Sequence, residues 1–473
     1  MNRRAFRTIF FLWLAWVLIL IGYQAWASAR LQPQFPDRSQ EWTTTYTAEG
    51  YQVNRPLLLD PFLNDQVCWD SEYYLGIAIG GYDDPRIPHL TPFGTTTYYM
   101  DHMLVGGRQY SGEAISLAYA FFPFYPWMIW LVSWPLKVLG LGEIATAALA
   151  GVIVSALGTL GGMLALYDLT CEKLEHEGAM RAVFYLLIFP TGFFLAQVYT
   201  EGLFVGLAFG CLAMLRRGKW LPAALLGAAA TLTRAVGVAL IIPMALTWFR
   251  TGDWLDVDLE WRQIYYLWKH ALHGTLIAIR KFCRERLRLP SAASEPSWDW
   301  LRQEMAPIRT VLASAGKMLL AFAPLIAFLI WKTSRLGISF DFVEMAYFGR
   351  GVLDFGGAFY NWSLAFEYLS SPIPARAAYF LTEVIGLVIG LVTILACLKR
   401  YPEIAWFSLA VFVISWGSGP VQGIQRYILG APAVFFMLAR WGKNPVFDKA
   451  WTIFSALWMG FLAYLFAVDF WVA

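Results

Sequence analysis

Four short segments of this sequence place acidic or basic side chains beside apolar runs, where polar groups are costly if the chain lies in a bilayer. The first is "CWDSEYYLGIAIGGYDDP", in which Asp70 and Glu72 follow Trp69. A carboxylate at the start of a helix can take a proton from an attacking hydroxyl. Asp70 can equally cap the N-terminus of that helix, so its spacing leaves a catalytic and a structural interpretation open.

The second segment is "FPTGFFLAQVYTEGLF", a proline-kinked stretch between two apolar runs. Tyr199 and Glu201 gather with two other polar residues at its turn. A glutamate flanked by apolar runs needs a partner or water. The alternative is a glutamate that is simply wetted at the membrane interface.

The other two segments carry arginines: "TLTRAVG" contains Arg234, and "SGPVQGIQRYILGAP" contains Gln425, Arg426 and Tyr427. A guanidinium at the end of a hairpin can hold a phosphate through two hydrogen bonds. Alternatively, Arg234 pairs with Glu201 for structural reasons, and Arg426 extends to the lipid headgroups.

Taken together, these residue types fit glycosyl transfer from a lipid-phosphate sugar. An acid would deprotonate the acceptor, and two arginines would hold the leaving lipid phosphate. A transporter or flippase of a lipid-linked substrate is the alternative. It should show polar residues at the bilayer midplane and broken helices in paired halves. Here the polar residues cluster at one face. A non-catalytic scaffold would leave them unexplained.

Motifs of other enzyme classes are absent from the sequence. There is no G-x-x-x-x-G-K-[ST], H-E-x-x-H or G-x-S-x-G, so ATPase, zinc-protease and lipase functions lack support. No basic, aromatic-interleaved pattern suggests nucleic acid. The sequence names no certain cofactor. A divalent metal could be held by Asp70 with Glu72 or Asp101, although this spacing is not diagnostic.

Composition determines which elements must position these residues. Hydrophobic residues make up 58% of the 473 residues and charged residues only 15%. So few charges could not cover the surface of a soluble protein of this length. Trp and Tyr, 23 of each, favour the headgroup level of a bilayer. We predict an all-α polytopic membrane protein that forms one domain over residues 1–473, with about 11 transmembrane helices.

The first apolar run, Thr8–Ala27, follows three arginines and carries no charge. It predicts an uncleaved anchor with a cytoplasmic N-terminus, and a signal peptide ending near "QAWASA" is the alternative. Residues 30–113 contain 11 acids and 5 arginines, which favours an extracytoplasmic loop. The proline-interrupted "LAYAFFPFYPWMIWLVSWPLKVLG" predicts helices in the outer interface, so that the loop covers residues 30–143.

The remaining apolar stretches predict further spans and hairpins. Lysines and arginines lie at most of the predicted inner ends. Residues 250–310 then form a cytoplasmic loop, in which "RKFCRERLR" predicts an amphipathic helix, and residues 332–377 form an extracytoplasmic loop. All four polar segments reach the outer face. The predicted spans and hairpins are 144–166, 182–215, 221–249 with its outer turn near Arg234, 311–331, 378–398, 404–416, 427–438 and 447–470.

These segments also resemble a known family. "WDSEYYLGIAIGGYD" followed by "AFFPFYPWMIWLV" resembles the external loop of the PIG-V-type mannosyltransferases, with its W-D-x-x-[WY]-Y…G-Y and F-F-P-[LF]-Y-P blocks. "FPTGFFLAQVYTEGLF", "LTRAVG" and "QRYILGAPAVFF" are similar to later blocks of that family in the same order. The resemblance covers residues 69–440, and "FGRGVLDFGGAFYNW" matches its block only loosely.

The resemblance implies a GT-C glycosyltransferase fold with an extracytoplasmic active site. It implies a polyprenyl- or dolichyl-phosphate sugar donor, usually mannose, and an inverting transfer to a lipid-linked or glycan acceptor. By the family pattern Asp70 would be the catalytic base. Glu201, Arg234 and Arg426 would line the site, with the arginines near the donor phosphate.

We expect Glu72, Tyr199, Gln425 and Tyr427 to share this substrate site. Membrane lipids would surround the spans. The expected location is the bacterial plasma (inner) membrane, or the ER membrane if the protein is eukaryotic. Bacteria make no GPI anchors, so a bacterial relative of this family would need another acceptor.

Overall fold

The computed structural model describes residues 3–31, 33, 35–48, 62–90, 104–105, 108–109, 114–251, 306–351 and 353–472. Helices dominate this part of the chain, and its strands are two residues long. The predicted all-α class is therefore confirmed. Asp101 and most of the predicted cytoplasmic loop 250–310 lie outside the described residues.

The chain divides into two compact units, Met1–Pro243 with Ala323–Ala473, and Met244–Phe322. The smaller unit contains most of α10 (Ile241–Thr251) and all of α13 (Ala306–Ala321). Within it the Trp248 indole N–H lies 3.0 Å from the Ser314 carbonyl oxygen, which ties these two helices together. All four polar segments belong to the larger unit.

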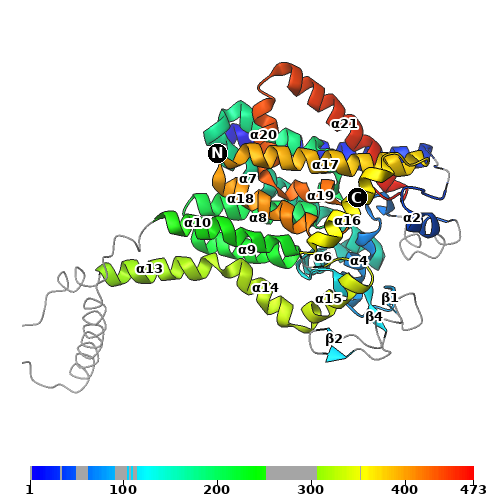
Figure 1. Ribbon diagram of the computed structural model, residues 1–473, viewed down its shortest axis with the longest axis horizontal. Coiled ribbons are helices and arrows are strands. Elements are labelled where there is room, and N and C mark those ends of the chain that lie inside the picture. The colour runs from blue at the N-terminus through cyan, green and yellow to red at the C-terminus, as the bar shows by residue number, and fades with distance from the viewer. Residues whose placement is uncertain are drawn as a thin grey trace, which may run out of the picture. The chain divides into compact units, whose positions relative to one another are not determined.

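The larger unit holds long helices that run side by side, as α17 and α18 do (Figure 1). Its α-helices are α1 (Arg3–Arg30), α2 (Glu41–Tyr46), α4 (Asp70–Gly80), α6 (Phe124–Leu136), α7 (Glu143–Ile188), α8 (Glu201–Arg216), α9 (Trp220–Thr233), α14 (Ala323–Thr333), α15 (Arg335–Ala346), α16 (Phe355–Tyr368), α17 (Pro374–Leu398), α18 (Pro402–Trp416), α19 (Ile424–Tyr427), α20 (Pro432–Trp441) and α21 (Pro445–Ala467).

Short elements connect these helices. The 3-10 helices are η2 (Asn64–Gln66), η3 (Leu117–Ala120), η4 (Lys137–Leu139), η5 (Gly192–Ala196), η6 (Ala235–Leu240) and η7 (Ile428–Gly430). Strand β1 (His89–Leu90) pairs antiparallel with β4 (Ile115–Ser116), with His89 opposite Ser116. Strand β2 (Leu104–Val105) pairs antiparallel with β3 (Arg108–Gln109).

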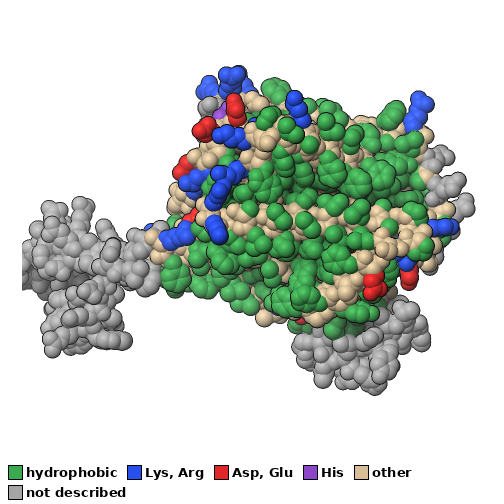
Figure 2. Space-filling view, turned by 45° about the horizontal axis from the view of Figure 1, so that its top comes forward, with side chains coloured by type: hydrophobic (Ala, Val, Ile, Leu, Met, Phe, Trp, Pro, Cys, Tyr) green, Lys and Arg blue, Asp and Glu red, His purple; other side chains and the backbone are tan. Residues whose placement is uncertain are grey.

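Four described helices, α1, α7, α17 and α21, are long and apolar enough to cross a membrane. Large apolar side chains on them face outward: Leu18, Ile19 and Leu457 are 62%, 70% and 71% exposed. Hydrophobic side chains cover most of the described surface in Figure 2. Water would disfavour such a surface and lipid would not, so the chain is an integral membrane protein. The count of about 11 spans stays a prediction.

Two regions allow a closer comparison of the predicted spans with the observed helices. Helix α7 covers 46 residues but is broken at Glu175, whose φ of 59° is not helical, and this break lies between the predicted stretches 144–166 and 182–215, as expected. The predicted span 311–331 falls on two helices, α13 and α14, with residue 322 between them. Pro324 lies in the first turn of α14, where a missing N–H is tolerated. In the middle of one continuous helix the same proline would remove a backbone hydrogen bond and break the helix.

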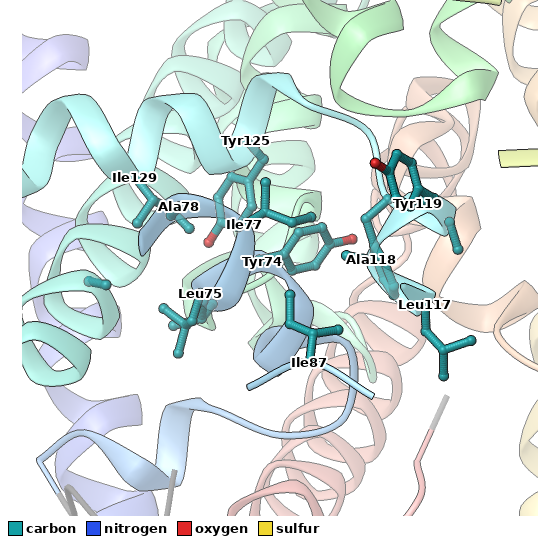
Figure 3. Close-up of a cluster of buried hydrophobic side chains, with 14 of the residues drawn as sticks. Tyr74, Leu75, Ile77, Ala78, Ile87, Leu117, Ala118, Tyr119, Tyr125 and Ile129 are labelled. Carbon is teal, nitrogen blue, oxygen red and sulfur yellow. The ribbon is translucent and has the colours of Figure 1, made fainter. Parts of the chain in front are cut away.

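A buried apolar cluster fixes helix α4, which carries Asp70 at its N-terminus. Tyr125 of α6 extends the cluster to α7, because its hydroxyl lies 3.1 Å from the Gly151 carbonyl oxygen and 2.9 Å from Ser155 Oγ. The position of Asp70 therefore depends on packing over three helices. The labelled members of the cluster in Figure 3 are Tyr74, Leu75, Ile77, Ala78, Ile87, Leu117, Ala118, Tyr119, Tyr125 and Ile129.

Glycines set the distance between α7 and α8. A Cβ on Gly158 would lie 2.5 Å from Leu203 Cα and 2.6 Å from the Gly202 carbonyl oxygen. Only a glycine fits such a contact without moving the helices, as at other small-residue helix interfaces in membranes. Because α8 begins at Glu201, this close packing also fixes where that carboxylate lies.

We therefore expect Gly158→Ala to push α7 and α8 apart and to cost about 1–3 kcal/mol of stability. Gly161→Ala is the matched control, since the nearest atom to its Cβ would be Gly206 Cα at 3.9 Å. The measurement is the midpoint of thermal unfolding in detergent. Equal midpoints for the two variants would contradict the packing described here.

Candidate active site

The larger unit contains a cavity of about 1550 Å³, and residues from all four polar segments line it. Aromatic side chains form much of its wall. Its charged lining residues in the described chain are Glu41, Asp70, Glu72, Arg86, Glu201, Arg234, Lys332, Asp341, Glu344, Arg350, Arg376 and Arg426. Glu72 lies in the first turn of α4, beside Asp70.

Asp70 is the first residue of α4 and is 22% exposed. It does not cap its own helix, because Trp69 occupies the N-cap position. The Asp70 backbone N–H donates to the Tyr199 hydroxyl at 3.2 Å, and that hydroxyl donates to the Cys68 carbonyl oxygen at 3.0 Å. The Asp70 carboxylate accepts a hydrogen bond from Arg426 at 3.2 Å. Its side chain is thus held at the cavity wall by a cation.

The backbone before Asp70 is strained. Trp69 has φ 52° and ψ −108°, a conformation that side-chain-bearing residues rarely adopt. Such strain costs on the order of 1–3 kcal/mol and persists where the surroundings over-determine it, often at functional sites. It occurs here directly before the predicted base.

Glu201 is the first residue of α8 and only 3% exposed. Its Oε1 accepts a hydrogen bond from Arg234 and lies 3.4 Å from Arg426 Nε. Glu201 is therefore buried and paired with two arginines rather than wetted at an interface. The N-terminal end of α8 adds further stabilisation to its negative charge. The alternative in which Arg234 pairs with Glu201 agrees with this geometry.

Three guanidinium groups surround the ring of Tyr427. The Cζ atoms of Arg234, Arg426 and Arg350 lie 4.8, 5.2 and 5.8 Å from its centroid. Arg350 also donates to the Tyr427 hydroxyl at 2.7 Å. Among the described residues no carboxylate lies within ion-pair distance of Arg350, whereas the other two arginines are paired.

Two of the expected site residues do not line the cavity. Tyr199 is 1% exposed and supports the backbone around Asp70. Gln425 is 2% exposed, and its side-chain amide donates to the Val472 carbonyl oxygen at 2.8 Å. The structure thus brings Asp70, Glu72, Glu201, Arg234, Arg426 and Tyr427 to one cavity and places Tyr199 and Gln425 behind its wall.

Sequence reasoning missed two charged residues near the cluster. Arg350 belongs to "FGRGVLDF", where the family pattern is matched only loosely. Glu344 lies on α15 and lines the cavity. Burial raises the pKa of the Glu344 carboxyl to about 7, while Arg350 acts to lower it and Asp70 and Asp341 act to raise it. Both residues lie in the predicted extracytoplasmic loop 332–377, where a charge is expected and does not stand out.

A third missed residue is Glu383 of α17, which is fully buried. Its carboxylate accepts hydrogen bonds from the Gly423 N–H at 2.7 Å, the Gln425 N–H at 3.3 Å and the Tyr379 hydroxyl at 2.8 Å. Glu383 thus holds the backbone that leads into Arg426. A carboxylate inside an apolar stretch is the sequence signal that could have found it.

A metal site is not assigned. In the part of the chain that the structure describes, no three His, Cys, Asp or Glu side chains are arranged to hold a metal ion. One of the expected ligands, Asp101, lies outside that part. The prediction of a divalent metal therefore stays untested.

No family model and no curated protein matches the chain. Several solved structures are similar to it. The chain is similar to the archaeal oligosaccharyltransferase AglB from Archaeoglobus fulgidus in complex with an inhibitory peptide and a dolichol-phosphate. The identity is 17% and the TM-score 0.35, over 96% of this chain and 55% of that one. The apo form of that enzyme gives 14% identity and a TM-score of 0.36, over 97% of this chain and 56% of that one.

The chain is also similar to ArnT from Cupriavidus metallidurans bound to undecaprenyl phosphate. The sequence identity is 15% and the TM-score 0.27, over 85% of this chain and 80% of that one. The chain spans about half the length of the oligosaccharyltransferase it matches.

We expect Glu383→Ala to loosen the segment that carries Arg426, because it leaves two backbone N–H groups without their acceptor. Each costs about 1–3 kcal/mol when buried unpaired. Amide hydrogen exchange should therefore accelerate in a peptide covering residues 419–430, measured by mass spectrometry. Glu383→Gln, which keeps one acceptor oxygen, should give a smaller effect. Glu367→Ala, an exposed change on α16, is the control. Unchanged exchange in Glu383→Ala would refute the positioning role.

Proposed function

We propose that the protein is a GT-C-type membrane glycosyltransferase. It would transfer a sugar, mannose by its family resemblance, from a polyprenyl- or dolichyl-phosphate donor to a lipid-linked or glycan acceptor on the extracytoplasmic face. One observation carries the proposal: Asp70 lies in the same cavity as the three arginines around Tyr427, of which Arg350 has no carboxylate partner among the described residues. Transfer from a sugar phosphate needs such a base and such an anion site.

The proposed reaction is a single in-line displacement. The Asp70 carboxylate takes the proton of an acceptor hydroxyl, and the acceptor oxygen forms a bond to the anomeric carbon of the donor sugar. The bond from that carbon to the phosphate oxygen breaks, and the lipid phosphate leaves with the electron pair. Attack opposite the leaving group inverts the anomeric configuration. Arg426, hydrogen-bonded to Asp70, keeps the carboxylate oriented for this step.

The charges of the cluster support Arg350 as a ligand of the donor phosphate. Glu201 already pairs with Arg234 and Arg426, and Asp70 pairs with Arg426 as well. These two arginines are therefore partly neutralised. Arg350 keeps its charge, and its hydrogen bond to Tyr427 fixes its orientation. A phosphate beside Tyr427 would lie within reach of all three guanidinium groups.

Asp70→Asn keeps the shape of the side chain and removes the base. We expect it to lower sugar transfer by about 10²–10⁴-fold. The assay uses purified protein in liposomes with polyprenyl-phosphate mannose as donor and a crude lipid extract as acceptor, and gel filtration checks the fold. Asp83→Asn, an exposed change on the loop after α4, is the matched control and should keep wild-type activity. A fully active Asp70→Asn protein would show that Asp70 is structural, and a wild type that moves no sugar from any lipid donor would overturn the transferase itself.

The anion site should respond to pH through Glu344. Its carboxyl is neutral below about pH 7 and charged above it, because burial raises its pKa to about 7. Once charged, it competes with the phosphate for Arg350. We therefore expect the KM for the donor to rise as the pH increases through 7.

Two variants check this assignment by steady-state kinetics across pH 5.5–8.5 (roughly one and a half pH units on either side of the Glu344 pKa). Glu344→Gln should remove the rise in KM. Arg350→Gln should raise the donor KM about tenfold or more at low pH, because a hydrogen bond to a charged group contributes about 1.5–3 kcal/mol. Arg335→Gln, 72% exposed and away from the cavity, is the control. A pH profile that Glu344→Gln leaves unchanged would disprove this role.

A further inference from the structure

A second part of the same cavity is built from aromatic rings. Trp42, Tyr46, Trp69 and Trp471 all line it. The three indoles contact one another edge to face: ring centroids are 5.5 Å apart for Trp42 and Trp69, 4.9 Å for Trp42 and Trp471, and 5.3 Å for Trp69 and Trp471. We call these four residues the aromatic wall. Such packing fixes the rings in one arrangement.

The aromatic wall is assembled from three distant parts of the chain. Trp42 and Tyr46 belong to α2, Trp69 precedes α4, and Trp471 lies in the C-terminal tail. The Trp471 backbone N–H donates to Asp37 at 2.9 Å, and the Trp69 indole N–H donates to the Phe470 carbonyl oxygen at 3.4 Å. Hydrogen bonds thus hold the tail in place. Tryptophans that only anchor a protein in the membrane interface do not need such ring contacts and hydrogen bonds between distant parts of the chain.

The strained backbone of Trp69 links the aromatic wall to the predicted base. Its φ of 52° lets the indole join Trp42 and Trp471 while the next residue, Asp70, begins α4. Asp70 therefore has two different neighbours. Through Trp69 it adjoins the aromatic wall, and through Arg426 it adjoins Tyr427 and Arg350.

Polar groups accompany the rings of the aromatic wall. Gln40 lines the cavity and is 8% exposed. Arg376, also in the cavity lining, lies 3.5 Å from Glu41. An isoprenoid chain at this wall would take water from the Arg376–Glu41 pair and replace none of its hydrogen bonds, which costs free energy. A sugar offers apolar C–H faces to the rings and hydroxyls to the charged pair.

We propose that the aromatic wall is the acceptor subsite and that the acceptor carries a hexose ring, which packs on Trp42 and Trp471 and directs a hydroxyl to Asp70. This inference rests on the proposed transferase function and names its acceptor class: a glycan or glycolipid, not a peptide or a sugar-free lipid. The donor phosphate then lies on the other side of Asp70, beside Arg350. A base between the two subsites is what transfer between them requires.

Saturation-transfer-difference NMR tests the subsite with the full chain in nanodiscs. The probes are the methyl α-glycosides of mannose, glucose and galactose. We expect signals from the ring C–H protons of at least one probe. Trp42→Ala should weaken them roughly tenfold. Trp42 is partly exposed, so this change leaves the buried core intact. Trp130→Ala, 52% exposed on α6 and not in the cavity lining, is the matched control and should match wild type.

Two further arms separate this inference from the proposed function. Undecaprenyl-phosphate mannose should leave the signals in place, and their displacement would show that the probe had occupied the donor subsite. Asp70→Asn should keep the signals while losing transfer. A wild type that transfers sugar but gives no probe signal, or equal signals from Trp42→Ala and wild type, overturns the acceptor subsite and leaves the transferase proposal standing.

Discussion

The site depends on one buried arginine shared by two carboxylates. Arg426 is 4% exposed and contacts Asp70 at 3.2 Å and Glu201 at 3.4 Å. A guanidinium so far from water is tolerated only when it is paired and hydrogen-bonded. The N-termini of α4 and α8 must therefore meet beside α19. The glycine contact at Gly158, the apolar cluster beneath α4 and the Glu383 hydrogen bonds each position one of these three elements.

Much of this arrangement could be predicted because charges inside apolar runs are conspicuous. Glu201, Arg234 and Arg426 stand out in that way, and the structure brings them together with Asp70. The same criterion applies to Glu383, which an attentive search of the apolar run 378–398 would have found. Arg350 and Glu344 gave no such signal, because they lie in a predicted loop, where charged residues are common. Only the fold brings them to the cavity.

The long apolar helices could be predicted from hydropathy, but the contacts between helices could not. The sequence has 39 glycines, and nothing in it indicates that Gly158 faces α8 while Gly161 has room around it. The aromatic wall was equally hidden. The sequence has 23 tryptophans, and nothing in it singles out Trp471. Trp471 reaches the cavity because the neighbouring Phe470 carbonyl oxygen accepts a hydrogen bond from Trp69, which is 401 positions away from Phe470. Interface anchors and cavity linings share one composition and differ only in tertiary contacts.

In the proposed reaction, the charge balance of the cluster would favour the transition state over the bound donor. Asp70 and Glu201 carry two negative charges and Arg234, Arg350 and Arg426 carry three positive ones, so these five groups together have an excess of one positive charge. A sugar phosphodiester brings one negative charge. As its bond to the sugar breaks, the leaving phosphate gains more. Arginines held in place by Glu201 and Tyr427 would need no reorganisation to stabilise that added charge, so their interaction with the phosphate would strengthen along the proposed reaction.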